Sequence, residues 1–293
     1  MNAFKDENFI QYDKKKVKNE TKNLALYFVV HITLYVALFF FLLFFAWYTY
    51  FVITHEFYAV KGVSMMPTLN SQIEYIDGKF PANAQQLSYD AVYIDKSTSP
   101  RMFDIVVAKP SSSDSVIKRL MATEGDYITI AKGTTSDGKD CFYYYRIPKG
   151  TDLTSINDED FKLDESTGEN GYTIFGYEDW YNSKVSTYTP VKTIGSQGYE
   201  YYFYNTFLSE YEPTNSNYFT SSSGLVYVKV PQGKCFLMGD NRGHSTDGRE
   251  NGFTDTEKIV GRVEFIVENY SFVNRVVEVV KFYFSEMEKF FAR

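Results

Sequence analysis

The chain has 293 residues and a net charge of −7, and Tyr and Phe contribute 26 residues each. This length provides enough apolar mass for one large domain or two small ones. The acidic balance argues against a nucleic-acid-binding surface, so we expect no nucleic acid among the partners.

A long uncharged segment lies near the N-terminus. The 30 residues from Leu24 to Ile53 include no Asp, Glu, Lys or Arg. Because a membrane-spanning helix needs about 20 apolar residues, residues 24–53 predict a transmembrane helix. A cleaved signal peptide is the poorer alternative, because the apolar stretch is too long and no small-x-small cleavage motif follows it.

The lysines on the two sides of this segment predict its orientation. Residues 1–23 contain six lysines, whereas the twenty residues after the segment contain only Lys61. The positive-inside rule therefore places a basic tail, residues 1–23, in the cytoplasm and everything after Ile53 outside. We expect a single-pass protein of the plasma membrane with an extracytoplasmic domain.

The chain beyond the span is predicted to be mostly β. Its short runs are rich in Val, Ile, Tyr and Phe and are bounded by Gly, Asp, Pro and Ser. They are EFYAVKGV, DAVYID, DIVVAK, DYITIA, CFYYYRI, YEYYFYN, LVYVKV and CFLMGD. We assign residues 54–131 and 226–269 to one domain. Residues 132–225, rich in Ser, Thr, Tyr, Gly and Asp, are predicted to form a β subdomain inserted into it.

The C-terminal residues 270–293 predict an amphipathic helix. Its apolar residues recur at helical spacing: Phe272, Val273, Val276, Val277, Val280, Phe284, Met287 and Phe291. Charged residues interrupt the segment too often for a second membrane span. Packing on the domain and contact with the membrane interface both stay open.

The cysteines and histidines indicate no metal or redox site. Cys141 and Cys235 have no metal-ligand or redox spacing. We expect two free core thiols, with a disulfide as the alternative. His31, His55 and His244 have no local acidic partner with which to form a metal site. We expect neither a metal nor a cofactor.

Four short stretches carry the chemistry. They are GVSMMPTL from Gly62, RMFDIVVAKP from Arg101, VIKRLMATEGDYI from Val116 and MGDNRGHSTDGRE from Met238. In order and content they resemble the four sequence boxes of type I signal peptidases, the membrane-anchored Ser/Lys proteases that remove signal peptides from secreted proteins. The resemblance covers the anchor and about fifty residues of motif and flank, but not residues 132–225.

The boxes match to different degrees. The first is filled by Ser64, Met65, Pro67, Thr68 and Leu69, and the last by Gly239, Asp240, Asn241, Arg242, Ser245, Asp247 and Arg249. The third is matched by Lys118, Arg119, Gly125 and Asp126, with Ala122 and Glu124 where a Gly and a Pro are usual. The second departs most, because Arg101-Met-Phe-Asp104 is one residue longer than the usual Arg-Gly-Asp and lacks its Gly.

The resemblance implies an antiparallel-sheet fold with Ser64 as the nucleophile and Lys118 as its base. A serine hydroxyl attacks poorly until a base takes its proton. Lysine can be that base only when it is neutral, and burial among apolar groups favours the neutral amine. Val116 and Ile117 precede Lys118, and Met65 follows Ser64, so apolar neighbours are present in the sequence.

Further roles follow only from the resemblance. Ser245 would hydrogen-bond and orient the Lys118 amine, and the supporting residues would be Arg119, Asp240, Asp247 and Arg249. The Ser64 backbone N–H would serve the oxyanion hole. Gly62 stands where some relatives have a hydroxyl, so a second donor must be a backbone group or water. The substrate pocket, selective for small residues such as Ala, would be lined by Val60, Gly62, Met65, Leu69, Val116 and Ile117.

We therefore expect an enzyme that removes signal peptides from exported preproteins. The lipid bilayer and the export translocon are the other expected partners. One alternative is a self-cleaving Ser/Lys protease, which the long anchor and the absence of a DNA-binding segment oppose. Another is a catalytically inactive tethered protein, which the presence of both Ser64 and Lys118 opposes. His244 is tempting as a base, but it occupies a variable position of the last box, and we treat it as a surface residue.

Overall fold

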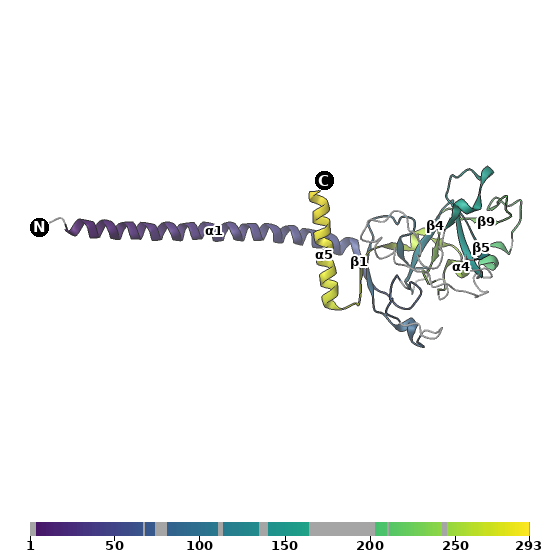
Figure 1. Ribbon diagram of the computed structural model, residues 1–293, viewed down its shortest axis with the longest axis horizontal. Helices are drawn as coiled ribbons and strands as arrows, with labels where there is room; N and C mark the ends of the chain where they lie inside the picture. The colour runs from purple at the N-terminus through teal and green to yellow at the C-terminus, as the bar shows by residue number, and fades with distance from the viewer. Residues whose placement is uncertain are drawn as a thin grey trace. The chain divides into compact units, whose positions relative to one another are not determined.

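The computed structural model describes residues 4–66, 68–73, 81–110, 114–134, 140–163, 203–209, 211–241 and 245–292. The chain forms two compact units, Met1–Thr54 and His55–Arg293. Figure 1 follows the chain from the purple helix α1 in the first unit to the yellow helix α5 at the end of the second.

The first unit is one helix, α1 (Phe4–Thr54). Its segment Glu20–Thr54 is long and apolar enough to cross a membrane, by length and composition. The span expected at 24–53 lies within this segment. Its threonine hydroxyls are satisfied inside the helix, since Thr33 Oγ1 donates to Val29 O at 2.8 Å and Thr49 Oγ1 donates to Phe45 O at 2.8 Å. A helix with internally satisfied polar groups suits an apolar surrounding.

The second unit contains a seven-stranded antiparallel sheet. Its strands, in spatial order, are β1 (His55–Ala59), β2 (Ala91–Asp95), β12 (Ile259–Val267), β3 (Ile105–Ala108), β4 (Val116–Thr123), β10 (Lys234–Met238) and β11 (Thr254–Asp255). Strand β12 pairs with both β2 and β3. Segments before and after the expected insertion therefore share one sheet.

A second sheet has five antiparallel strands. In spatial order they are β7 (Lys162–Leu163), β6 (Asp140–Ile147), β5 (Tyr127–Thr134), β9 (Val226–Lys229) and β8 (Tyr218–Thr220). This sheet combines strands from within the expected insertion with strands that reach beyond its edges at 132 and 225. A long segment of the insertion, residues 164–202, lies outside the described residues.

Helices in the second unit are few among the described residues. They are α4 (Gly248–Asn251) and α5 (Phe272–Phe291), with the short 3-10 turns η1 (Ala84–Gln86), η2 (Leu153–Ser155), η3 (Asp158–Phe161) and η5 (Thr256–Lys258) and the π-helical turn η4 (Tyr204–Leu208). The amphipathic helix expected at 270–293 is α5.

Alternation along β4 separates two neighbouring cations. Met121 of β4 packs in the main core cluster, whereas Val116 and Leu120 pack in a second cluster. Successive side chains of a strand point to opposite faces. Lys118 therefore shares a face with Val116 and Leu120, and Arg119 points to the other face.

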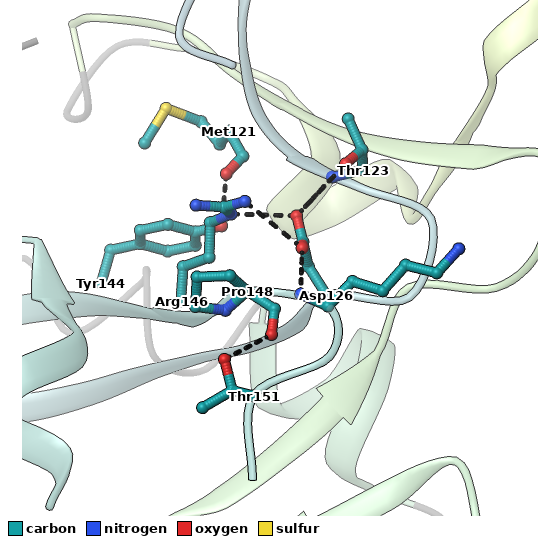
Figure 2. Close-up of polar contacts among 8 residues, drawn as sticks. Met121, Thr123, Asp126, Tyr144, Arg146, Pro148 and Thr151 are labelled. Carbon is teal, nitrogen blue, oxygen red and sulfur yellow. Dashed lines mark hydrogen bonds and ion pairs between the residues drawn. The ribbon is translucent and has the colours of Figure 1, made fainter. Parts of the chain in front are cut away.

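The turn from β4 to β5 is held by a single carboxylate. Asp126 Oδ2 accepts from Thr123 N and from Arg146 Nε, each at 2.9 Å, and Oδ1 accepts from Lys149 N at 2.9 Å (Figure 2). Gly125 has φ +86°, which favours glycine. The Gly-Asp pair of the third box therefore ties the β5–β6 hairpin to the strand that carries Lys118.

One expected strand is wrong. The aromatic run YEYYFYN at 199–205 predicted β structure, but Tyr204–Leu208 is π-helical, and residues 199–202 lie outside the described residues. Phe203 and Phe207 are four residues apart, and their buried rings contact each other with centroids 4.8 Å apart. A helical turn brings both rings into the core, and this tertiary packing overrides the strand propensity of aromatic residues.

The second box, Arg101–Asp104, forms a turn although it lacks the usual glycine. Phe103 has φ +68°, a conformation that costs a non-glycine residue about 1–2 kcal/mol. The turn closes because Asp104 N donates to Arg101 O at 3.0 Å and Asp104 Oδ2 accepts from Arg101 N at 2.6 Å. The Phe103 ring is buried in the main core, where burial contributes about 2–3 kcal/mol. Packing of the ring thus offsets the backbone strain.

Candidate active site

Ser64 and Lys118 are in direct contact, and Lys118 comes from an interior strand of the larger sheet. Ser64 lies in the loop after β1, and Lys118 lies on β4. Lys118 Nζ donates to Ser64 Oγ at 2.9 Å. Lys118 is 7% exposed, and Ser64 is half-buried. Among the described residues this is the only hydrogen bond of the Lys118 amine.

The two nearby carboxylates are already bound by arginines. Arg119 Nε donates to Asp240 Oδ1 at 2.7 Å, and Arg119 Nη2 pairs with Asp240 Oδ2. Arg249 Nε donates to Asp247 Oδ1, and Nη2 donates to Oδ2, each at 2.9 Å. Each carboxylate therefore has a bidentate arginine partner of its own, and neither carboxylate is hydrogen-bonded to the Lys118 amine among the described residues.

Burial lowers the pKa of Lys118 below its ordinary value. The charges of Asp247 and Asp240 oppose this shift, and the charge of Arg249 adds to it, but desolvation dominates. Burial alone would raise the pKa of Asp247, yet the Arg249 guanidinium and the hydrogen bonds to the carboxylate hold that pKa below its usual range. The site thus combines an ionised carboxylate with a lysine that is easily made neutral.

A glycine allows the last box to approach the serine loop closely. A Cβ on Gly239 would lie 2.1 Å from Ser245 Oγ and 2.5 Å from Ser64 O, distances that no real side chain tolerates. Ser245 and the backbone of Ser64 therefore flank the same glycine. Asp247 Oδ2 fixes this glycine by accepting from Gly239 N at 2.9 Å.

The expected hydrogen bond between Ser245 and Lys118 is not formed. Ser245 Oγ is buried and has no hydrogen-bond partner among the described residues, while the amine donates to Ser64. Arg249 Nη2 donates to Ser245 O at 3.3 Å, so the Asp247–Arg249 pair holds Ser245 through its backbone. The structure places Ser245 beside the pair but does not show it orienting the amine.

The loop that carries Ser64 is bound to the last box through its backbone. Asn241 N donates to Ser64 O at 3.0 Å, and Asn241 Nδ2 donates to Val63 O at 3.0 Å. Thr68 Oγ1 donates to Asp240 Oδ2 at 2.6 Å. Among the described residues no hydrogen bond satisfies the Ser64 N–H, which leaves this donor for a ligand.

The backbone at Gly62 disfavours a side chain. Its φ is +79°, a conformation that strains any residue with a Cβ, and a Cβ would also displace the end of the Gln85 side chain, whose Oε1 would lie 2.6 Å away. A hydroxyl-bearing residue at this position would therefore be strained. The Ser64 N–H is thus a donor that the described geometry leaves available beside the serine hydroxyl.

Sequence reasoning missed Asn70, which fixes the other end of the loop. Asn70 is fully buried. Its Nδ2 donates to Val60 O at 3.1 Å and to Gly62 O at 2.9 Å, and its Oδ1 accepts from Tyr89 N and Asp90 N. Its φ is +58°, a conformation that Asn tolerates better than most residues. An Asn directly after the first box was the only available signal.

The expected pocket residues lie on different surfaces. Val60, Met65 and Leu69 are buried in the main core cluster, and Ile117 packs against it. Val116 packs on the second cluster, on the Lys118 face. The first three expose 2% or less, so they support the serine loop from beneath and offer almost no surface to a ligand in this conformation.

No group of three or more His, Cys, Asp or Glu side chains that could hold a metal ion occurs in the described part of the chain. His244 and Arg242 lie outside the described residues. Cys235 is a free buried cysteine, and burial raises the pKa of its thiol to about 12. The side chain of Cys141 is outside the described part as well.

The family model and the similar proteins that follow agree on one family. A family model described as "Signal peptidase, peptidase S26" matches residues 31–268. Signal peptidase I of Bacillus caldolyticus is 27% identical over 208 residues, which cover 71% of this chain and 76% of that protein. Signal peptidase I of Rickettsia typhi is 30% identical over 173 residues, which cover 57% of this chain and about half, 52%, of that protein.

A crystal structure of a signal peptidase I from Enterococcus faecalis is also similar. It is 17% identical, and the match covers 56% of this chain and 97% of that chain with a TM-score of 0.25.

The Arg119–Asp240 pair provides a stability test. Both side chains are fully buried, so removing one partner leaves an unpaired buried charge. We predict that Arg119→Met and Asp240→Leu each destabilise the protein by about 3–5 kcal/mol. The double variant should lose clearly less than the sum, as measured by thermal unfolding of the full chain in detergent.

The exposed pair of Lys149 with Glu124 at 3.5 Å is the matched control. Lys149→Met should cost about 0–1 kcal/mol. Strictly additive losses for Arg119→Met and Asp240→Leu would show that the two residues do not stabilise each other.

Proposed function

Because the chain belongs to the signal peptidase family, peptidase S26, we propose that it is a membrane-anchored serine endopeptidase that removes N-terminal signal peptides from exported preproteins. Ser64 is the nucleophile and Lys118 is the general base. The observation that supports these two roles most is the 2.9 Å hydrogen bond between Ser64 Oγ and a buried Lys118 amine.

In the first step, Ser64 Oγ attacks the carbonyl carbon of the scissile peptide bond while its proton passes to the neutral Lys118 amine. The carbonyl oxygen becomes an oxyanion that accepts a hydrogen bond from the Ser64 N–H. As this intermediate collapses, Lys118 returns the proton to the leaving amine, and the acyl group stays on Ser64 Oγ as an ester. Water, deprotonated by Lys118, then hydrolyses the ester.

The supporting residues act through charge and position. Arg119 and Arg249 engage the carboxylates of Asp240 and Asp247, so that neither carboxylate holds the lysine in its charged form. We assign Ser245, whose Oγ lies beside Gly239, as the residue that orients the amine once substrate displaces the Ser64 hydrogen bond. Of the expected pocket residues, Val116 on the Lys118 face is partly exposed, and we assign it to the surface that accepts small side chains at the cleavage site.

The alternatives from the sequence gain no support. A catalytically inactive relative has no need for a lysine amine buried against a serine hydroxyl, yet this contact is formed. No observation on the described residues favours self-cleavage.

Membrane topology and the further partners complete the proposal. We place residues 1–23 in the cytoplasm, the apolar segment of α1 in the plasma membrane and the second unit outside it. The lipid bilayer holds the enzyme next to exported chains, and the export translocon delivers its preprotein substrates.

We predict that Ser64→Ala and Lys118→Met each lower kcat/KM on a signal-peptide substrate by on the order of 10⁴-fold or more, because the two groups act as a unit. The double variant should be no worse than either single variant. Thermal unfolding should show an intact fold, since Met replaces a lysine whose charged form burial disfavours.

Lys61→Met and Thr246→Ala are the matched controls, because both residues are exposed and lie near the site in sequence. Both variants should keep near wild-type activity. If Lys118→Met also kept it, the Ser/Lys mechanism would be wrong.

Activity should rise with pH. Burial lowers the pKa of Lys118, and only the deprotonated amine can accept the serine proton. At a pH below this lowered pKa the ammonium form dominates and kcat/KM should fall, whereas above it kcat/KM should reach a plateau. A pH profile of kcat/KM, with circular dichroism at each pH to confirm folding, measures this. A flat profile from mild acid to mild alkali contradicts a lysine base.

Cysteine labelling tests the orientation. In a Cys141→Ser background, a membrane-impermeant maleimide added outside cells should label Ser222→Cys, which replaces an exposed residue, but not Lys14→Cys. After the cells are lysed, both sites should react. Labelling of Lys14→Cys in intact cells would reverse the proposed topology.

A further inference from the structure

The helix α5 turns its apolar side chains away from the domain. Ser271 caps the helix, since its Oγ accepts from Asn274 N at 3.1 Å. Spaced at four-residue intervals along one ridge, its large side chains are exposed: Phe272 77%, Val276 45%, Val280 39% and Phe284 60%. On the adjacent ridge Val273 and Val277 are 66% and 42% exposed. An amphipathic helix of a water-soluble domain would bury such a stripe.

A different face of α5 holds the helix on the domain. Arg275 Nε donates to Tyr93 Oη at 2.6 Å, and its guanidinium lies 4.4 Å from the centre of the Phe57 ring. Phe282 stacks on Phe265 of β12 with ring centroids 5.0 Å apart. At 100° per residue, Arg275 and Phe282 lie about 140–160° around the helix from the centre of the exposed stripe. These contacts fix the rotation of the helix, so the stripe cannot roll inward without breaking them.

The docked helix lies at the point where the domain begins. Phe282 also packs on His55, with ring centroids 5.6 Å apart. His55 is the first residue of β1, and a single peptide bond joins it to Thr54, the last residue of the apolar segment Glu20–Thr54. A membrane-spanning segment must bring its end to the bilayer surface. Because α5 packs on His55, the residue that follows this end, chain connectivity keeps α5 close to that surface.

We propose that α5 lies in the membrane interface and that its exposed stripe, Phe272, Val273, Val276, Val277, Val280 and Phe284, is covered by lipid acyl chains. The inference rests on the membrane anchoring proposed above. The helix has three acidic residues, Glu278, Glu286 and Glu288, and three basic ones, Arg275, Lys281 and Lys289. With balanced charges, binding depends on apolar burial and needs no anionic lipid. The helix thereby fixes the height and tilt of the Ser64 site over the membrane.

Spin labels on the full chain test this contact. Single cysteines replace Val276 in the stripe, Ser285 on the exposed polar side and Leu38 in α1, in a Cys141→Ser/Cys235→Ala background. Each protein is placed, one chain per disc, in phosphatidylcholine nanodiscs. Accessibility to oxygen, which concentrates in lipid, is compared with accessibility to a water-soluble nickel chelate. The oxygen-to-nickel ratio should be several-fold higher at Val276 than at Ser285 and should approach that at Leu38.

The same ratios should persist at high salt and with added phosphatidylglycerol. The triple variant Val276→Ser/Val280→Ser/Phe284→Ser changes only exposed side chains. A spin label at Val277 should lose its lipid-like oxygen-to-nickel ratio in this variant. The variant should keep the unfolding temperature of the wild type and its cleavage of a soluble peptide.

Three results would overturn the proposal. In the first, the label at Val276 is as accessible to the nickel chelate as the label at Ser285, while the label at Leu38 has a lipid-like oxygen-to-nickel ratio. This result would support the anchoring of α1 but show that α5 does not lie in the membrane. Shielding of Val276 that occurs only with two chains per disc would assign the stripe to a second copy. A water-like ratio at Leu38 would disprove the anchoring on which the inference rests.

Discussion

The proposed chemistry of this protein depends on one lysine amine that is buried and, among the described residues, has no carboxylate of its own. Lys118 and Arg119 are neighbours on β4, and strand alternation sends them to opposite faces. Arg119 binds Asp240, and Arg249 binds Asp247, so the nearby negative charges are shared with guanidinium groups that stay protonated. What is left for the lysine is a serine hydroxyl at 2.9 Å. The buried ion pairs therefore matter less for net stability than for determining which cation loses its charge.

The position of the serine depends on backbone hydrogen bonds made by residues outside the dyad. Asn241 holds the carbonyls of Val63 and Ser64, and Asn70 holds those of Val60 and Gly62. Gly239 allows the two boxes to touch. The loop is thus bound on both sides of Ser64, and its neighbours orient the Ser64 N–H, which has no hydrogen-bond partner in the part of the chain that the structure describes. Such preorganisation lowers the cost of stabilising an oxyanion.

Much of this arrangement was predictable from local pattern, and the exceptions have physical causes. The apolar run predicted a spanning helix, alternating aliphatic runs predicted most strands, and the ordered boxes predicted that Ser64 and Lys118 belong to one site. Asn70 escaped notice because its partners are backbone groups near residues 60 and 90, which no sequence pattern marks. Phe103 adopts a glycine-like φ because its ring fills the core. Likewise, periodicity predicted α5, but only the contacts of Arg275 and Phe282 reveal which face the helix leaves exposed.

The most direct test of this account is the pKa of Lys118 itself. Nuclear magnetic resonance of the protein with ¹³Cε-labelled lysine, with the Lys118 signal assigned by its loss in Lys118→Met, measures the titration of the amine independently of turnover. Since burial lowers this pKa, the Lys118 signal should titrate at a lower pH than the other lysine signals of the spectrum. A Lys118 signal that titrates together with the other lysine signals would contradict a neutral lysine base and with it the proposed mechanism.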